Sequence, residues 1–207
     1  MKFSYTLDKQ IHTSVSLLGH SENDHIFKHI KQNSSFYENS LLRYMYFIKQ
    51  LSRESFDVCF DIGANIGNHS VFIGKFLTSK VVSVEPNRHL KKILLDNLSN
   101  NNTSFKLFNC GLGAISTLGK MTFSDKADNN IGMGKIVLTH DSHDAIQIDT
   151  LDNIFLQSEH YFKQQLKIFL IKIDVEGMEL DVLKGALNVI NSQKPHLFIE
   201  ASTNDEK

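Results

Sequence analysis

The segment Phe60-Asp61-Ile62-Gly63-Ala64-Asn65-Ile66-Gly67-Asn68-His69 is the starting point for interpreting this chain. An apolar run ends near an acidic residue, two glycines follow, and a helical pattern begins after them. Glycine tolerates positive φ, and its lack of a Cβ lets a ligand lie against the backbone. Such a strand, turn and helix are typical of the place where an open α/β sheet binds its ligands.

Apolar runs with the length of buried strands occur on both sides of this turn, at residues 57–62, 80–84, 105–110, 168–173 and 196–200. Helical patterns bounded by Gly, Pro or Asn lie between several of them, at residues 67–77, 88–98 and 176–190. Apolar strands alternating with helices predict an α/β, Rossmann-like fold, with a mainly parallel sheet and flanking helices.

Two regions depart from this alternation. Residues 114–151 contain short strand patterns at 120–124, 135–139 and 145–149, around the polar stretch 124–130, and predict an antiparallel insertion. Before the first strand, residues 36–51 have helical spacing. With no repeat or long linker, we expect one domain over residues 1–207, comprising an N-terminal helical region (1–52) and a Rossmann-like core (53–207).

The composition is that of an ordinary globular protein. A net charge of -1 and the lack of any dense Lys and Arg run argue against a nucleic-acid partner. No apolar run approaches the length of a membrane span, and the first residues lack a secretory signal pattern, so we expect a cytoplasmic protein without a membrane partner. The histidines show no zinc-binding spacing, and Cys59 and Cys110 are expected to be small core residues.

The turn after the first predicted strand and the acid after the second distinguish a dinucleotide cofactor from S-adenosylmethionine. A dinucleotide fingerprint would need Gly at positions 63, 65 and 68, and the chain has Asn65 and Asn68. S-adenosylmethionine has no pyrophosphate but carries a sulfonium and an ammonium, which a carboxylate such as Asp61 complements. Glu85 follows Gly63 at about the spacing where an acid binds ribose hydroxyls in such folds. Alternatively, Gly63 only makes a tight turn and Asp61 caps the next helix.

Two motifs resemble the signatures of the FkbM-type methyltransferases. The first is Asp61-Ile62-Gly63-Ala64-Asn65-Ile66-Gly67. The second is Ile171-Lys172-Ile173-Asp174-Val175-Glu176-Gly177-Met178-Glu179, followed by Val182-Leu183-Lys184-Gly185-Ala186. Lesser similarities, among them Tyr37-Glu38 and Val84-Glu85-Pro86, extend the resemblance over residues 37–202. The family version of the fold adds two further strands, so the sequence predicts a domain that lacks the last strands.

This resemblance implies an S-adenosylmethionine-dependent enzyme that methylates hydroxyls of sugars or other small molecules. It assigns the methionine part of the cofactor to the first motif, the ribose to the acid after the second strand, and the adenine to an amide after the third. The cofactor residues that it implies are Asp61, Gly63, Asn65, Gly67, Glu85 and Asn109.

The second motif supplies the expected catalytic residues. Methyl transfer needs an aligned nucleophile and a base, and alternate strand positions place Lys172, Asp174 and Glu176 on one face. Asp174 is the preferred base, with Glu176 orienting the substrate and Lys172 steering an anion or acting as a base if desolvated. Glu179 is interpreted as favouring a helix N-terminus. Two carboxylates could hold magnesium, but no metal is assigned.

The resulting hypothesis is an O-methyltransferase acting on a small-molecule or glycan acceptor. The lack of an Asn-Pro-Pro-aromatic motif favours oxygen over nitrogen as the acceptor atom. One alternative is a non-catalytic binding or scaffold module that retains the methyltransferase fold. Another is a nicotinamide-dependent oxidoreductase, disfavoured by Asn65 and Asn68. The acceptor and the oligomeric state stay open.

Overall fold

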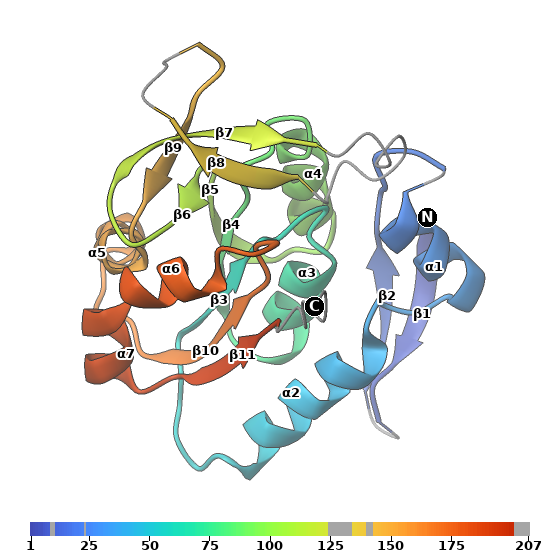
Figure 1. Cartoon of the computed structure of the whole chain (residues 1–207). Helices are drawn as coiled ribbons and strands as arrows, with labels where there is room; N and C mark the ends of the chain where they lie inside the picture. The colour runs from blue at the N-terminus through green and yellow to red at the C-terminus, as the bar shows by residue number, and fades with distance from the viewer. Residues whose placement is uncertain (9–10, 23, 124–133, 140–142, 201–207) are drawn as a thin grey trace, which may run out of the picture.

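The computed structural model describes residues 1–8, 11–22, 24–123, 134–139 and 143–200. At its centre lies a parallel sheet with the strand order β11-β10-β3-β4-β5 (Figure 1). The strands are β3 (Val58–Ile62), β4 (Lys80–Val84), β5 (Ser104–Phe108), β10 (Ile168–Ile173) and β11 (His196–Ile199). All five predicted strands are present within two residues of their expected bounds, so the predicted α/β fold with a mainly parallel sheet is confirmed.

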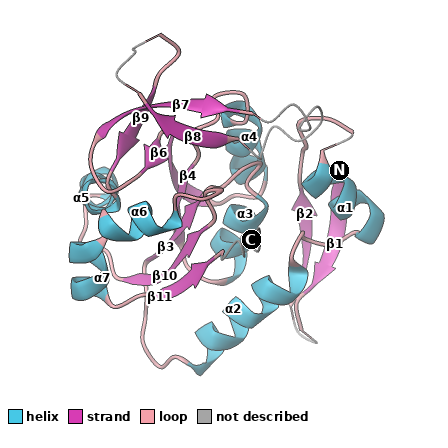
Figure 2. Ribbon diagram, viewed as in Figure 1, coloured by secondary structure: helices cyan, strands magenta, loops and turns pink. Residues whose placement is uncertain are grey.

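Helices cover both faces of this sheet, as Figure 2 shows. On one face, Cys59, Val81 and Leu170 pack in a core with α3 (Asn68–Phe76), α4 (Lys91–Asn100) and the N-terminal region. On the other, Phe60 and Ile171 pack with α5 (Leu151–Phe162), α6 (Glu179–Lys184) and α7 (Leu187–Gln193). Side chains alternate between the two faces along each strand, so fully apolar strands fill both cores.

The predicted helix over residues 176–190 is in fact two helices, α6 and α7, and the interruption is at Gly185. A Cβ at this position would lie 2.1 Å from the carbonyl oxygen of Gly113. The Gly185 carbonyl also accepts a hydrogen bond from the backbone of Asp152 at the start of α5. The close approach of neighbouring backbone therefore favours the break that helical periodicity did not predict.

The insertion after β5 forms a second sheet in the order β6-β9-β7-β8. Its strands are β6 (Gly111–Leu112), β7 (Thr117–Thr122), β8 (Lys135–Leu138) and β9 (Ile146–Asp149). The expected antiparallel pairing holds for β7 with β8 and β9, whereas β6 pairs with β9 in parallel. The polar stretch 124–130 lies outside the described residues.

The N-terminal region is not entirely helical, which corrects the expectation for residues 1–52. It begins with an antiparallel hairpin of β1 (Lys2–Thr6) and β2 (His12–Ser16), and α1 (His25–Asn33) and α2 (Asn39–Leu51) follow. The inward side chains of β1 meet Phe36 and the aromatic side chains of α3, with Tyr5 and Phe36 ring centroids 4.9 Å apart. This aromatic packing attaches the hairpin to the core.

Two buried asparagines, Asn97 on α4 and Asn101 directly after it, bind the backbone of the N-terminal region. Asn97 accepts from the Leu18 amide at 2.7 Å and donates to the Leu18 carbonyl at 2.9 Å. Asn101 makes the same pair of bonds with Ser16, at 3.0 and 2.6 Å. Asn97 also donates to the Ile66 carbonyl at 2.7 Å, so one side chain joins the N-terminal region to the turn after β3. No helix in the described ranges is long and apolar enough to cross a membrane.

Candidate functional site

Five residues meet at the carboxyl edge of the central sheet because each directly follows a strand. The last residues of the strands are in register, Ile62 with Val84 and Ile173, Val84 with Phe108, and Ile173 with Ile199. The next positions are Gly63, Glu85, Asn109, Asp174 and Glu200. This is the edge at which open parallel sheets bind ligands.

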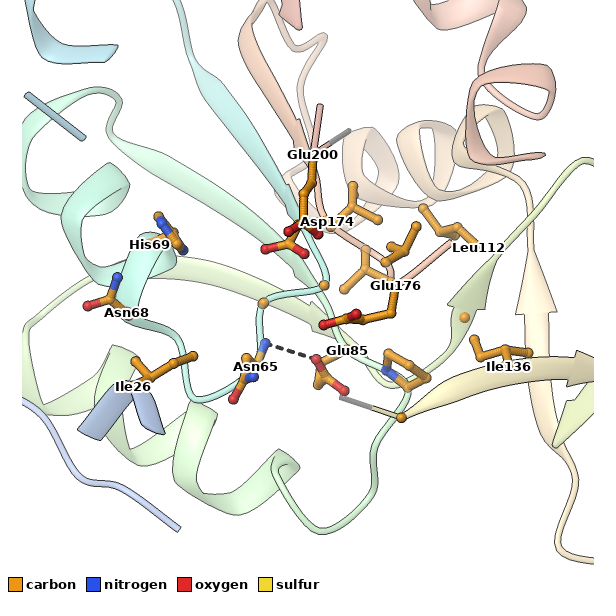
Figure 3. Close-up of a pocket in the computed structure, with 18 of the residues that line it drawn as sticks. Ile26, Asn65, Asn68, His69, Glu85, Leu112, Ile136, Asp174, Glu176 and Glu200 are labelled. Carbon is orange, nitrogen blue, oxygen red and sulfur yellow. Dashed lines mark hydrogen bonds between the residues drawn. The ribbon is translucent and has the colours of Figure 1, made fainter. Parts of the chain in front are cut away.

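A cavity of about 400 Å³ opens at this edge, between the central sheet, the second sheet and the N-terminal region. Figure 3 shows Glu85 on one side and Asp174, Glu200 and His69 on another. Five of the predicted site residues line this cavity: Gly63, Asn65, Glu85, Asp174 and Glu176. The remaining predicted residues, Asp61, Gly67, Asn109 and Lys172, lie outside the cavity wall.

Gly63 permits the close contact between the first turn and the end of β10. Its φ is 78°, in the left-handed region. A Cβ there would lie 1.7 Å from the carbonyl oxygen of Asp174, so no larger residue fits without moving backbone. The Gly63 amide donates to the Val84 carbonyl at 2.9 Å. The turn is thus fixed between two neighbouring strand ends.

Gly67 shapes the turn from outside the cavity. It has a φ of 88° and precedes α3, and its amide donates to the Ala64 carbonyl at 2.8 Å. A Cβ would lie 2.5 Å from Leu94 Cδ1, so a larger residue would also have to displace the Leu94 side chain of α4. Its predicted cofactor contact is better described as support for the loop that lines the cavity.

Glu85 is buried, and its two carboxylate oxygens accept hydrogen bonds from backbone amides. Oε2 accepts from Asn65 at 2.8 Å and Oε1 from Asn87 at 2.7 Å. Burial raises the pKa of Glu85 to about 7, against the opposing effect of these two bonds. Asn109 donates to the Glu85 carbonyl at 2.6 Å, so it holds the end of β4 and does not line the cavity.

Asp61 and Lys172 form a buried layer beneath the cavity. The Asp61 side chain is fully buried, and its Oδ2 accepts from Ser70 Oγ at 2.5 Å. Lys172 Nζ lies 3.6 Å from Asp61 Oδ1 and 2.9 Å from Asp174 Oδ2. Burial would lower the pKa of Lys172, but the charges of Asp61 and Asp174 outweigh it and raise the pKa. Lys172 therefore stays protonated, which disfavours its predicted role as a base. Its burial outside the cavity wall disfavours the other predicted role, contact with an anionic substrate.

Asp174 and Glu200 face one another at the cavity wall, as Figure 3 shows. Burial would raise the pKa of Asp174, but the charge of Lys172 and hydrogen bonds from Glu200 and Lys172 lower it. The hydrogen bond with Asp174 raises the pKa of Glu200 to about 7. Two carboxyl groups in contact cannot both ionise easily, so the pair shares a proton near neutral pH.

The N-terminal region adds Glu38 to the site, a residue that was not among the predicted site residues. Glu38 directly precedes α2 with a φ of 53°, and its Oε2 lies 3.0 Å from His69 Nε2. This contact with His69 lowers the pKa of Glu38. The amide group of Asn68 holds the segment in place by bonding both the amide and the carbonyl of Tyr37, at 3.0 and 3.1 Å.

The loop between β10 and α6 separates the roles of two acids. Glu179 Oε1 accepts from the backbone amides of Val175 and Gly177, at 3.2 and 3.0 Å. This agrees with the interpretation of Glu179 as a helix N-terminal residue. Glu176 has a φ of 56° and lines the cavity, where burial and the charge of Asp174 raise its pKa. Within the described ranges, no three His, Cys, Asp or Glu side chains are grouped as a metal site would need.

Comparison with known proteins gives the class and then the family. A structure titled methyltransferase FkbM, from Methylobacillus flagellatus KT, has the same fold, with a TM-score of 0.50 and 24% identity over 75% of this chain and 36% of that one. This chain therefore shares the fold of that structure. The family description "Methyltransferase FkbM domain" matches residues 61–207, and the chain belongs to this family.

Two structures from Pyrococcus horikoshii are more distant. One is described as a candidate RNA methyltransferase, with a TM-score of 0.31 and 22% identity over 35% of this chain and 37% of that one. The other is described as a candidate transferase, with a TM-score of 0.29 and 18% identity over 38% and 30% of the two chains. No curated protein matches this chain significantly.

Proposed function

We propose that this chain transfers a methyl group from S-adenosylmethionine to a hydroxyl of a sugar or another small hydroxylated acceptor. The observation that carries the proposal is the position of the cavity. It joins the glycine turn after β3 and Glu85 to a group of carboxylates at the same sheet edge. Membership of the FkbM methyltransferase family supports the type of reaction.

The lining residues fit the parts of this cofactor. The turn from Gly63 to Asn65 presents backbone for the methionine part, and the Glu85 carboxylate keeps lone pairs for two ribose hydroxyls. Leu112 and Ile136, on the second sheet, offer apolar surface for a flat ring such as adenine. When bound, S-adenosylmethionine supplies an electrophilic methyl group. The net positive charge of this cofactor suits a cavity lined by carboxylates.

Asp174 is best placed to receive the proton of the acceptor hydroxyl. It faces the cavity, and the ammonium of Lys172 behind it keeps it ionised at neutral pH. Asp174, with Glu200 beside it, would accept the proton that the acceptor hydroxyl loses during methylation. Asp61 holds the ammonium of Lys172 from the other side, so both act as positioning residues behind the base.

The experiment that tests this function is calorimetric titration of the chain with S-adenosylhomocysteine and, separately, NAD. Glu85→Ala is the test variant, and Glu54→Ala is the matched control because Glu54 precedes β3, at the opposite edge of the sheet. We expect saturable binding of S-adenosylhomocysteine alone, lost in Glu85→Ala and kept in Glu54→Ala. Because Glu85 is buried, thermal unfolding of each variant is measured alongside to separate lost binding from lost folding.

Transfer is then measured with radiolabelled S-adenosylmethionine and a panel of hydroxylated acceptors, with Asp174→Asn as the test variant. Transfer that falls by about 100-fold in Asp174→Asn, the scale of a lost general base, supports the mechanism. Binding without transfer to any acceptor would favour the non-catalytic module instead. Binding of NAD in place of S-adenosylhomocysteine would favour an oxidoreductase.

A further inference from the structure

The cavity has two chemically different ends. Figure 3 shows Leu112 and Ile136 on one side of the cavity, and the proposed function assigns them, with Glu85, to the adenosine part of the cofactor. Asp174, Glu200 and His69 lie away from Ile136, toward the other side of the cavity (Figure 3). The second end is therefore where the acceptor meets the methyl group.

The acceptor end is lined by hydrogen-bond acceptors of negative charge. Asp174 and Glu200 contribute a carboxyl pair, and Glu38 contributes a third carboxylate from the N-terminal region. Among the described residues that line the cavity, none is Lys or Arg. Lys135 is near enough to Glu176 to lower its pKa, so Glu176 is left out of this count.

The ammonium directly behind this wall, that of Lys172, is already paired. Lys172 is 3% exposed and lies between Asp61 and Asp174, so its ammonium does not face an acceptor. His69 lies against Glu38, with Nε2 and Oε2 3.0 Å apart. A phosphate or carboxylate placed among Glu38, Asp174 and Glu200 would therefore meet like charge, and none of the described residues that line the cavity is Lys or Arg. An ammonium would find several partners there.

We propose that the acceptor carries a protonated amino group beside its hydroxyl, as an amino sugar does, and that Glu38 sets this preference. This inference rests on the proposed function and names its substrate class. The Glu38 side chain is 41% exposed and belongs to a segment outside the family match over residues 61–207. Its partial exposure leaves the Glu38 carboxylate accessible to an acceptor.

The test compares three sugars that share a scaffold and differ in charge: glucosamine, glucose and glucose 6-phosphate. Their affinities for the full chain are measured by ligand-observed NMR, with and without S-adenosylhomocysteine. We expect glucosamine to bind at least about tenfold more tightly than glucose, and glucose 6-phosphate to bind more weakly than glucose. Raising the salt concentration should narrow the difference, because screening weakens the interaction between charges.

Glu38→Gln tests the assigned residue, and Glu54→Gln is the control that removes the same charge at the opposite edge of the sheet. The ratio of glucosamine to glucose affinity should fall several-fold in Glu38→Gln and stay unchanged in Glu54→Gln. Equal or tighter binding of glucose 6-phosphate, binding of no sugar, or an unchanged ratio in Glu38→Gln would overturn the inference. Failure of the wild-type chain to bind S-adenosylhomocysteine would instead count against the proposed function.

Discussion

Replacing Gly63 with alanine tests whether the end of β10 lies as close to the first turn as described. The added Cβ would lie 1.7 Å from the carbonyl oxygen of Asp174 and 2.8 Å from its carbonyl carbon. The carbonyl oxygen must retreat by more than an ångström, at a strand end where Asp174 donates to the Ile62 carbonyl at 3.0 Å. Alanine must also adopt a φ of 78°.

The expected loss of stability follows from three contributions. Left-handed backbone costs a residue with a Cβ about 1 to 2 kcal/mol. Losing the backbone hydrogen bond of Asp174 adds about 1 kcal/mol. Displacing packed backbone adds about 1 kcal/mol more, so Gly63→Ala should lower the free energy of unfolding by about 3 to 4 kcal/mol. It should also abolish binding of S-adenosylhomocysteine, because the turn lines the cavity.

Gly177→Ala is the matched control, since Gly177 has a φ of 106° and a Cβ there would meet no atom within 4 Å. It retains only the conformational cost, about 1 to 2 kcal/mol. Urea denaturation followed by circular dichroism gives both free energies, and calorimetry gives the affinities. If Gly63→Ala proves no less stable than Gly177→Ala, the close contact between the turn and β10 is refuted.

Three further results are expected. Affinity for S-adenosylhomocysteine, measured by calorimetry, should rise between pH 6 and pH 8. The reason is that Glu85, with a pKa of about 7, accepts ribose hydrogen bonds best when ionised. The Glu85→Gln variant should show no such rise. Lys172→Met should lower the free energy of unfolding at pH 7, measured by urea denaturation, by about 3 to 5 kcal/mol, because buried carboxylates lose their cation. At pH 4 Asp174 can take up a proton, so an equal loss there would contradict this reason. Asn97→Ala should lower the free energy of unfolding by about 2 to 4 kcal/mol and speed amide hydrogen exchange in the N-terminal hairpin. Asn100 is exposed, so Asn100→Ala should do neither.

The central sheet could be predicted because its strands are buried on both faces and so appear as continuous apolar runs. The sequence around Asp61 and Gly63 also located the edge of the sheet where the cavity lies. Glu200 could have been predicted by the same reasoning, because it directly follows β11 just as Glu85 follows β4. The first hairpin had a visible signal too, since Phe3 and Tyr5 alternate with polar residues.

Other features depend on contacts that no local pattern contains. Alternation placed Lys172 and Asp174 on one face but could not show that Lys172 is buried while Asp174 lies at the cavity. The pairing of Glu38 with His69 joins segments separated by β3 and the first turn, and it depends on how the N-terminal region docks. Burial depth and docking are tertiary properties, and sequence periodicity does not encode them.

Asn97 and Asn101 give the chain a route by which its choice of acceptor can evolve separately from the methyl-transfer reaction. These asparagines bond only main-chain groups of the N-terminal region, so their hydrogen bonds do not depend on which side chains that region carries. Mutations around Glu38 can therefore accumulate without disturbing the strand ends that hold Asp174 and Glu85. Chimeras that exchange residues 1–52 between relatives, with both asparagines retained, would then exchange acceptors while leaving the methyl donor unchanged.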